Sequence, residues 1–291
     1  MQVHLVDGTY ELFRHYFALP EHLNRDGQEI SATRGVLGSL LGMLEDGATH
    51  VGVATDHVVE SFRNDLYDGY KTGEGLEEEI HSQFPLLEEV LEAAGFAVWP
   101  MQDHEADDGM ATGAALASRD PRVEKIWLCT PDKDLAQCVE GARIVMLDRR
   151  KGVTMDEAGV REKFGVGPAS IPDYLGLMGD TADGFPGLPG WGARSSATVL
   201  AHYEHIEAIP ESEEDWEVKV RGAARLAATL VAEREDALLY RHLATLVRDA
   251  PEVGPVDGWR WTGPAENFEE ICDYLDSPRL PKRAQRLAEG R

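Results

Sequence analysis

The sequence contains no long hydrophobic run and very little cysteine. No apolar stretch approaches the roughly 18 residues that a membrane-spanning helix needs, so no membrane span is predicted. The three cysteines, Cys129, Cys138 and Cys272, are unevenly spaced and match neither a zinc motif nor a disulfide framework. Such cysteines are typical of buried thiols in a cytoplasmic protein, which is the location that we predict.

Positive charge is also scarce. The 291 residues include 28 Lys and Arg against 53 Asp and Glu, which gives a formal net charge of −25. A protein that binds nucleic acid normally presents clustered Lys and Arg to the phosphates. Two interpretations of the acid excess stay open: an acidic, soluble surface, or a functional cluster of acids that bound divalent cations neutralise.

Short apolar runs alternate with segments of helical periodicity through the first half of the chain. This alternation predicts an α/β domain with a mainly parallel central sheet flanked by helices. Ligands bind beyond the carboxyl ends of the strands in such sheets. Acids follow three of the predicted strands, namely Asp7, Asp56, and Asp132 with Asp134. The predicted strands are residues 2–6, 50–55, 96–101, 125–130 and 142–147.

Three further acids, Glu105, Asp107 and Asp108, stand where a predicted strand gives way to a helical run. The helix dipole favours acids in a first turn by about 0.3–1 kcal/mol each, which explains one or two of them. Three crowded carboxylates repel one another unless a cation lies among them. Carboxylates without paired Cys or His favour Mg²⁺ or Mn²⁺, and several of them suit two ions. Chance turn chemistry is the alternative, because Asp is also common in turns.

The second half of the chain is mainly helical, with a Gly- and Pro-rich stretch at 179–197. Its Gly190-x-Gly192 element leads into a predicted helix over 195–203, and N–H groups at a helix start can hold a phosphate. A lone Gly-x-Gly is more often a tight turn, but this one closely follows Asp180 and Asp183. Residues 62–75 are predicted to form a loop or arch, 76–94 and 211–250 helices, and 278–291 a basic solvated tail, with DNA contact as the alternative.

Taken in their order along the chain, these motifs resemble those of the 5′-nuclease (flap endonuclease) family. This family is found at the N-terminus of bacterial DNA polymerase I and in phage 5′–3′ exonucleases. The resemblance covers about residues 2–250. It rests on Asp7-Gly8, Asp56 with Phe62-Arg63 and Tyr70-Lys71, Glu105 to Asp108, Asp132-Lys133-Asp134, and Asp180 to Asp183 with Gly190 and Gly192.

The resemblance implies hydrolysis of DNA at 5′ ends or flaps by two Mg²⁺ ions, for which Mn²⁺ substitutes, in replication or repair. The first ion would be held by Asp7, Asp56, Glu105, Asp107 and Asp108, and the second by Asp132, Asp134, Asp180 and Asp183. Asp107 would also be catalytic. Lys71 and Arg63 would contact the scissile phosphate and Tyr70 would stack on a base. Duplex phosphates would be bound by Gly190, Gly192, Arg194 and Ser195, with a K⁺ ion nearby.

The resemblance also implies a domain plan. A PIN-like 5′-nuclease domain would span residues 1–165, with an arch at 62–95. A helix-hairpin-helix (helix-three-turn-helix) module would span 166–250, and an extension at 251–291 would pack on the core. We expect a monomer that stands alone, without a polymerase domain.

Three features of the sequence depart from the family pattern. The arch carries acids, among them Glu74, Glu77, Glu78 and Glu79, in place of basic residues. Gly184 stands where the family usually has Asn, and Arg194 where it has Lys. Because an acidic arch makes fewer contacts to phosphates, we expect weaker binding of single-stranded 5′ flaps. A nucleic-acid-binding homologue that has lost activity therefore remains an alternative, as does a related metal-dependent RNase, which the Gly-x-Gly module argues against.

Overall fold

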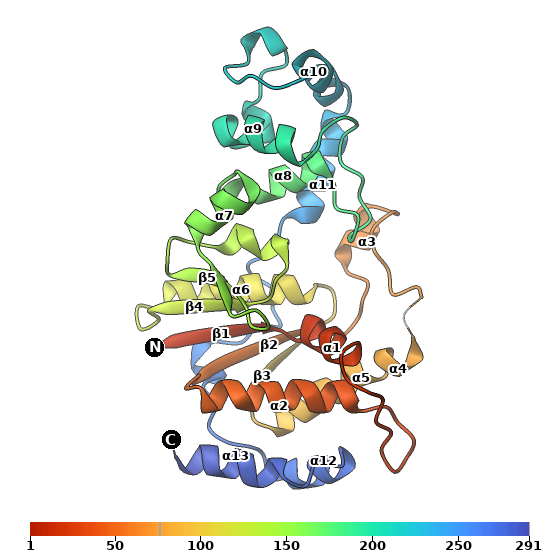
Figure 1. The fold of residues 1–291 in the computed structure, drawn as a ribbon, viewed down its shortest axis with the longest axis vertical. Coiled ribbons are helices and arrows are strands. Elements are labelled where there is room, and N and C mark those ends of the chain that lie inside the picture. The colour runs from red at the N-terminus through yellow and green to blue at the C-terminus, as the bar shows by residue number, and fades with distance from the viewer. Residues whose placement is uncertain (76, 291) are drawn as a thin grey trace. The chain divides into compact units, whose positions relative to one another are not determined.

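The computed structural model describes residues 1–75 and 77–290, and the chain forms two compact units. Unit 1 comprises Met1–Ser61, Gly73–Thr130 and Val247–Arg291, and unit 2 comprises Phe62–Thr72 and Pro131–Leu246. Each unit is therefore assembled from segments that are distant in the sequence, as the colours of Figure 1 show. Within the described ranges, no helix has the length and apolar character needed to cross a membrane.

Unit 1 is built on parallel strands that form because their apolar runs are short and buried on both faces. The strands are β1 (Gln2–Asp7), β2 (His50–Asp56), β3 (Ala97–Met101) and β4 (Lys125–Cys129), in the spatial order β3-β2-β1-β4. Leu5 of β1 pairs with Gly52 on one side and Leu128 on the other. Gly52 is required there, because a Cβ atom would lie 2.2 Å from the Trp99 ring. The predicted parallel sheet is confirmed.

Helices flank the sheet of unit 1. Helix α6 lies against all four strands, while α1 and α5 lie against β2. Both α1 and α5 also contact α2, whose Val36, Leu37, Leu40 and Leu41 are fully buried. The helices of this unit are α1 (Gly8–Tyr16), α2 (Ser31–Glu45), α4 (Glu78–His81), α5 (Gln83–Ala93), α6 (Ala106–Arg119), α12 (Phe268–Tyr274) and α13 (Leu280–Glu289).

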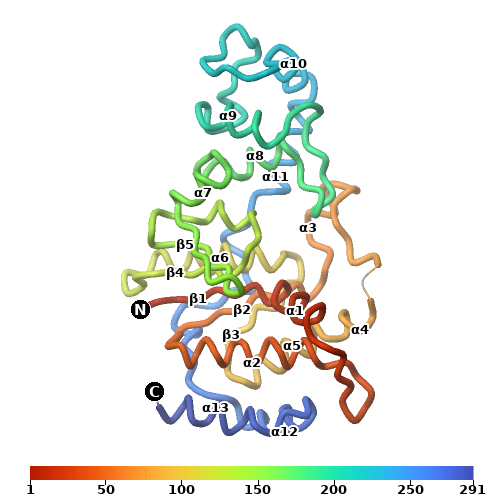
Figure 2. Tube along the Cα trace, in the orientation of Figure 1, coloured from red at the N-terminus to blue at the C-terminus, as the bar shows by residue number. Residues whose placement is uncertain are grey.

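The C-terminal segment belongs to unit 1 and is anchored by tryptophans. Trp259 packs edge-on against Trp99 at 5.2 Å between ring centroids, and the Trp261 indole N–H donates to the Ala94 carbonyl at 2.8 Å. The solvated tail predicted for residues 278–291 is wrong over most of its length, because α13 forms there and packs on α2 (Figure 2). At this contact Ala284 is fully buried, and Arg283 makes two 2.7 Å bonds to the Glu45 carboxylate. Arg291 lies outside the described residues.

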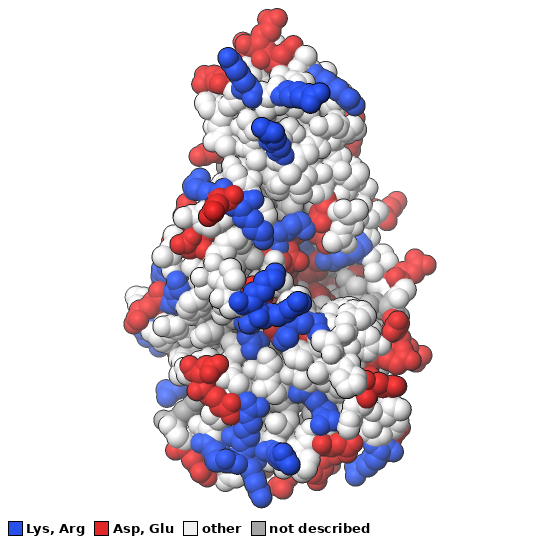
Figure 3. All heavy atoms as spheres, viewed as in Figure 1, with Lys and Arg blue, Asp and Glu red and all other residues white. Residues whose placement is uncertain are grey.

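The exposed side of α13 remains basic, with Lys282 and Arg286 both in solvent. Figure 3 shows positive side chains gathered at the lower end of the view, where α13 lies in Figure 1. This basic surface contrasts with the net charge of −25 of the whole chain.

Unit 2 is mainly helical, as predicted for the second half of the chain. Helices α8 and α11 approach closely at Gly176, where a Cβ atom would lie 2.9 Å from the Ala237 carbonyl oxygen. Strands β5 (Ile144–Asp148) and β6 (Val153–Met155) pair as an antiparallel hairpin. The helices are α3 (Phe62–Leu66), α7 (Glu157–Phe164), α8 (Ile171–Met178), α9 (Ala193–Tyr203), α10 (Ala223–Ala232) and α11 (Arg234–Ala244), with a 3-10 helix at Lys133–Cys138.

Three predicted segments differ from the structure in detail. The predicted loop over 62–75 contains the short helix α3. The helix predicted over 76–94 is divided at Ser82 into α4 and α5, and Leu76 lies outside the described residues. Within 211–250, regular α-helix begins only at Ala223, because Gly222 has a φ of 77° that an ordinary helix does not accept.

Candidate functional site

Asp7, at the end of β1, is held by two hydrogen bonds within unit 1. Its Oδ1 accepts the N–H of Tyr10 at 2.8 Å and so caps the start of α1. Its Oδ2 accepts the hydroxyl of Thr130, the residue after β4, at 3.0 Å. The side chain is 7% exposed. Asp7 thus links the carboxyl ends of two neighbouring strands.

Asp56 performs the corresponding role at the end of β2. Its Oδ1 accepts the backbone N–H of Ala106 at 2.7 Å, which is the first residue of α6. Its own backbone N–H donates to the Thr9 hydroxyl at 2.9 Å. The carboxylate therefore lies at the positive end of the α6 dipole, which stabilises its charged form.

The three acids at the start of α6 have three different environments. Glu105 precedes the helix, is 5% exposed, and accepts the Ser61 hydroxyl at 2.8 Å. Asp108 is completely buried, and its two oxygens accept the backbone N–H groups of Glu105 at 3.0 Å and Val247 at 2.8 Å. Asp107 is half-buried. Asp108 therefore fixes the helix start that carries Glu105 and Asp107.

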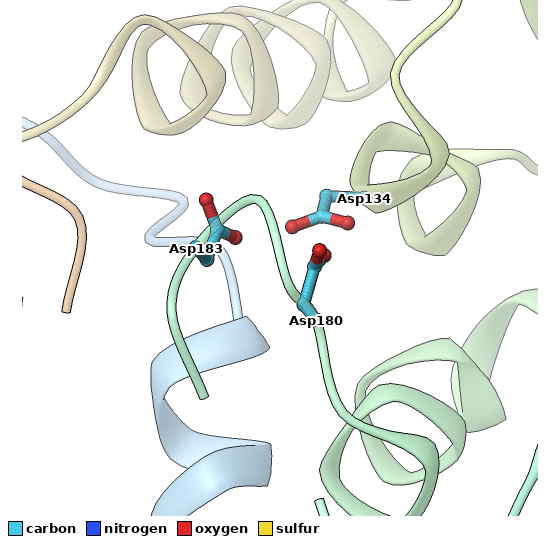
Figure 4. A group of neighbouring side chains, drawn as sticks. All are labelled: Asp134, Asp180 and Asp183. Atoms are coloured by element: carbon cyan, nitrogen blue, oxygen red, sulfur yellow. The ribbon is translucent and has the colours of Figure 1, made fainter. Parts of the chain in front are cut away.

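Unit 2 brings Asp134, Asp180 and Asp183 together. Each offers a carboxylate oxygen within 4.8 Å of the others, and all three residues are buried. Asp134 comes from the 3-10 helix, whereas Asp180 and Asp183 come from the loop that follows α8. Figure 4 shows the three carboxylates turned towards a common point. These are three of the four acids that the sequence assigned to a second metal ion.

The charge of this acid group is only partly compensated. Burial, followed by the charges of Asp132 and Asp183, raises the pKa of Asp134 well above its usual value. Among the described residues, Asp134 Oδ1 has no hydrogen-bond partner although it is buried. A buried carboxylate oxygen without a hydrogen bond is costly unless a cation binds it. Asp132 itself is exposed, and its Oδ1 accepts the Asp134 N–H at 3.0 Å.

Two lysines in unit 2 contact these carboxylates. The Lys71 ammonium lies 2.9 Å from Asp183 Oδ1, and the Lys71 N–H donates to the Asp183 carbonyl at 3.0 Å. Lys133 forms an ion pair with Asp180 and lies 3.7 Å from Asp134 Oδ1. Burial lowers the pKa of Lys133, but the neighbouring carboxylates outweigh it and raise that pKa above its usual value. Sequence reasoning missed Lys133, whose position between Asp132 and Asp134 was the available signal.

Arg63 and Tyr70 are buried in unit 2. Arg63 is 1% exposed, and its guanidinium donates to the carbonyls of Leu243 at 2.8 Å and Thr245 at 3.1 Å, at the end of α11. These contacts favour an anchoring role over the predicted contact with a phosphate. Tyr70 is 5% exposed and the Lys71 ammonium lies 5.6 Å from its ring centroid. Such burial favours packing over the predicted stacking on a base.

The Gly- and Pro-rich stretch of unit 2 forms the turn that leads into α9. Gly190 has a φ of 88°, and the Gly192 N–H donates to the Ser195 hydroxyl at 3.0 Å. Arg194 is exposed. Between these glycines, Trp191 is buried and its indole N–H donates to the Leu226 carbonyl at 3.2 Å. The tryptophan thereby fixes the turn, and the four residues predicted to bind phosphate lie within one short segment.

The backbone conformation and the close packing at position 184 explain why a glycine stands there. Its φ of 89° lies in the left-handed region, and a Cβ atom would approach the Gly69 carbonyl oxygen to 2.1 Å. Any larger residue would push the Gly69–Lys71 segment away from the loop that carries Asp183. Gly184, which differs from the family pattern, is therefore the residue that allows close packing beside Lys71.

Comparison with known proteins agrees with this geometry. The family model described as 5′-3′ exonuclease, N-terminal resolvase-like domain, matches residues 2–165, and that described as 5′-3′ exonuclease, C-terminal SAM fold, matches 166–267. DNA polymerase I of Bacillus subtilis is 34% identical over 98% of this chain, and that of Bacillus caldotenax is 35% identical over 94%. The chain spans about a third of the length of these relatives, 32% in both cases.

Solved structures share the fold. The bacteriophage T5 5′-exonuclease with bound zinc has a TM-score of 0.66 and 17% identity, and the alignment covers 99% of both chains. The catalytic core of Rad2 in complex with a DNA substrate has a TM-score of 0.61 and 16% identity, over 98% of this chain and 90% of that one. With both family models matched in order along one chain, the protein belongs to the 5′-3′ exonuclease family.

Proposed function

We propose that this protein is a Mg²⁺-dependent nuclease that hydrolyses DNA phosphodiesters at 5′ ends or flaps. The observation that carries the proposal is the buried group of Asp134, Asp180 and Asp183, in which Asp134 Oδ1 has no hydrogen bond from any residue that the structure describes. Buried carboxylates whose charge is only partly compensated suit a hard divalent cation. Mn²⁺ would substitute for Mg²⁺. We further propose that the protein acts in the cytoplasm as a monomer, in replication or repair.

Two sets of acids would hold two ions. In unit 1, the set is Asp7, Asp56, Glu105 and Asp107, with Asp108 as the residue that fixes the start of α6. In unit 2, the set is Asp134, Asp180 and Asp183, with the exposed Asp132 acting through the charge that it adds to Asp134. When bound, divalent ions activate the attacking water and neutralise charge on the leaving 3′ oxygen.

The two lysines of unit 2 would then serve the substrate. In the structure, Lys71 and Lys133 neutralise Asp183 and Asp180. With cations bound to these carboxylates, the ammonium groups lose their acid partners. We propose that they then bind the non-bridging oxygens of the scissile phosphate and stabilise the charge that develops there. Arg63 instead anchors α3 to the end of α11.

Duplex DNA would contact the turn before α9. The turn at Gly190 and Gly192 would let a phosphate approach the first turn of α9, where the exposed Arg194 adds a cation. The Gly192 N–H and the Ser195 hydroxyl, which bond to each other in the structure, would exchange that bond for the phosphate. We also propose that the backbone carbonyl groups of this turn would hold a K⁺ ion, which would neutralise phosphate charge there. The Rad2 catalytic core and a second phage T5 structure, a flap endonuclease, are both complexes with DNA, which supports this substrate class.

One assay tests the proposal. A labelled 5′-flap duplex is incubated with Mg²⁺ and either the wild type, Asp183→Asn or Asp107→Ala. We expect the wild type to release a short 5′ fragment and both variants to lose this activity. Absence of cleavage by the wild type over a range of Mg²⁺, Mn²⁺ and salt would contradict the proposal, and cleavage confined to a parallel single-stranded RNA would favour the RNase alternative.

One observation favours a second candidate, a binding protein without activity. Glu74, Glu77, Glu78 and Glu79 are all exposed in the arch segment, where like charge repels a single strand. The same assay separates the candidates, because a binding protein retards the flap duplex in a gel without cleaving it.

A further inference from the structure

The two residues on either side of Asp56 share one buried partner in unit 1. The Thr55 hydroxyl donates to Glu88 Oε1 at 2.7 Å, and His57 Nδ1 lies 2.7 Å from Glu88 Oε2. An ionised carboxylate only accepts hydrogen bonds, so His57 donates from Nδ1. A single side chain of α5 therefore holds both neighbours of Asp56.

Burying the Glu88 carboxylate costs free energy, which its hydrogen bonds to Thr55 and His57 offset. Glu88 is 6% exposed and Thr55 is fully buried. Removing a charged group from water costs stability unless hydrogen bonds replace the hydration. Each oxygen of Glu88 has one short bond to a residue next to Asp56, and neither bond leads to a distant part of the unit.

The carboxyl end of β2 lies at the limit of the sheet. Pairing with β1 ends at Asp7 opposite Ala54, two residues before Asp56. On the other side, Asp56 is the last residue of β2 that pairs with β3, opposite Met101. Asp56 thus has a strand neighbour on one side only, and contacts from outside the sheet add to the support of this strand end.

The direction of the side chains completes the geometry. Thr55 and His57, the latter just after the strand, both reach Glu88, whereas alternation along β2 turns Asp56 to the face opposite Thr55. Glu88 holds the strand from the face of Thr55 and His57, whereas Asp56 itself accepts the Ala106 N–H at the start of α6. Any rotation of the strand end would swing the Asp56 carboxylate, and Glu88 opposes that rotation.

We propose that Glu88 is a positioning residue for the metal ion of unit 1, which it serves by fixing the direction of Asp56. The inference rests on the proposed function, because it assumes that Asp56 is a ligand. Residues that orient metal ligands through hydrogen bonds affect metal affinity by about 10–100-fold when they are changed. A purely structural role for Glu88 would alter stability instead.

The test is Mn²⁺ binding to the full chain, measured by isothermal titration calorimetry, together with the Mg²⁺ dependence of flap cleavage. We expect Glu88→Gln to weaken the affinity of one Mn²⁺ site by about 10-fold. The Mg²⁺ concentration for half-maximal cleavage should rise by a similar factor. The rate at saturating Mg²⁺ should change little, because the chemical groups remain in place.

Two controls isolate the effect. Glu89→Gln makes the same chemical change on the next residue of α5, which is exposed. Thr33→Val removes another buried hydrogen bond to α5, the 3.1 Å bond from the Thr33 hydroxyl to Gln83, and so reports a loss of stability alone. Neither variant should alter Mn²⁺ affinity. If Glu88→Gln fails to fold, Thr55→Val removes one of the two bonds and should weaken the same site by a smaller factor.

The outcomes are distinct. If the wild type binds Mn²⁺ and cleaves DNA but Glu88→Gln, or Thr55→Val in its place, binds Mn²⁺ like the wild type, the positioning role is wrong and the proposed function stands. An equal loss of affinity in Thr33→Val would also overturn the positioning role, because stability alone would explain it. A wild type that neither binds Mn²⁺ nor cleaves DNA overturns the proposed function together with this inference.

Discussion

The negative charge of the acidic side chains is compensated differently in the two units. In unit 1, backbone N–H groups satisfy Asp7, Asp56 and Asp108, so these carboxylates also hold strands and helices in place. In unit 2, the ammonium groups of Lys71 and Lys133 pair with Asp183 and Asp180, and Asp180 also accepts the Ala182 N–H at 3.1 Å. Within the described part of the chain, Asp134 Oδ1 has no hydrogen bond. A carboxylate bound by backbone groups supports the fold, whereas one bound by flexible lysine side chains is ready to exchange its partner for a cation.

The largest effect that this comparison predicts is for Asp134→Asn in unit 2. Cleavage should fall by about 10²- to 10³-fold, the scale of losing one group that stabilises transition-state charge. Without metal, the stability should stay constant or rise, because the change removes repulsion from Asp132 and Asp183. Single-turnover cleavage and thermal unfolding in a chelator measure the two quantities. A clear loss of stability without metal would contradict the difference between the units.

Asp108→Asn in unit 1 should behave in the opposite way. An amide accepts only one of the two N–H groups that Asp108 binds, so the N–H of Glu105 or Val247 loses its partner. We expect the free energy of unfolding to fall by about 1–3 kcal/mol. Urea unfolding without metal measures it, with Asp134→Asn as the matched control. Equal stability of the two variants would show that the acids of the units do not differ in this respect.

Arg63→Lys tests whether a cation of unit 2 supports the fold instead of the substrate. The Arg63 guanidinium reaches the two carbonyls with two different nitrogens, whereas lysine has a single nitrogen, so we expect one of the two bonds at the end of α11 to be lost. Stability should fall by about 1–2 kcal/mol while cleavage at low temperature stays near that of the wild type. A large loss of cleavage at unchanged stability would instead restore the predicted contact with the phosphate.

The smallest effect concerns the exposed acids of the arch segment. Changing Glu74, Glu78 and Glu79 to Lys should strengthen binding of a single-stranded 5′ flap at low salt. The slope of log K against log salt should steepen by about 0.7 for each additional phosphate that the protein neutralises. Fluorescence anisotropy in Ca²⁺, which permits binding without turnover, measures this slope. Reversal of the exposed Glu213, Glu214 and Asp215 of unit 2 is the control and should leave flap binding unchanged.

The sequence predicted the parts of the fold that depend on local pattern. Apolar runs ending in Asp7 and Asp56 became the strands and turns expected of them, because periodicity and turn chemistry act over a few residues. The gathering of Asp134 with Asp180 and Asp183 was expected only through motif order along the chain. No local pattern relates residues that are so far apart in the sequence.

Other features depend on tertiary contacts and could not be predicted from the sequence. The burial of Arg63 follows from carbonyls at 243 and 245, which no pattern near residue 63 reveals. Helix α13 packs on α2, where Arg283 binds Glu45, a partner 238 positions away. Glu88 resembles any other acid of an amphipathic helix until β2 places Thr55 and His57 beside it. Charge patterns in the sequence therefore did not reveal the partners of these individual charged side chains.

The most direct test of the account is anomalous diffraction from crystals of the protein soaked in Mn²⁺. The account predicts one anomalous peak among Asp134, Asp180 and Asp183 and a second beside Asp7, Asp56 and Glu105, with Lys71 and Lys133 displaced from their carboxylates. Crystals without a peak at Asp134, Asp180 and Asp183, and with both lysines still paired at millimolar Mn²⁺, would contradict it.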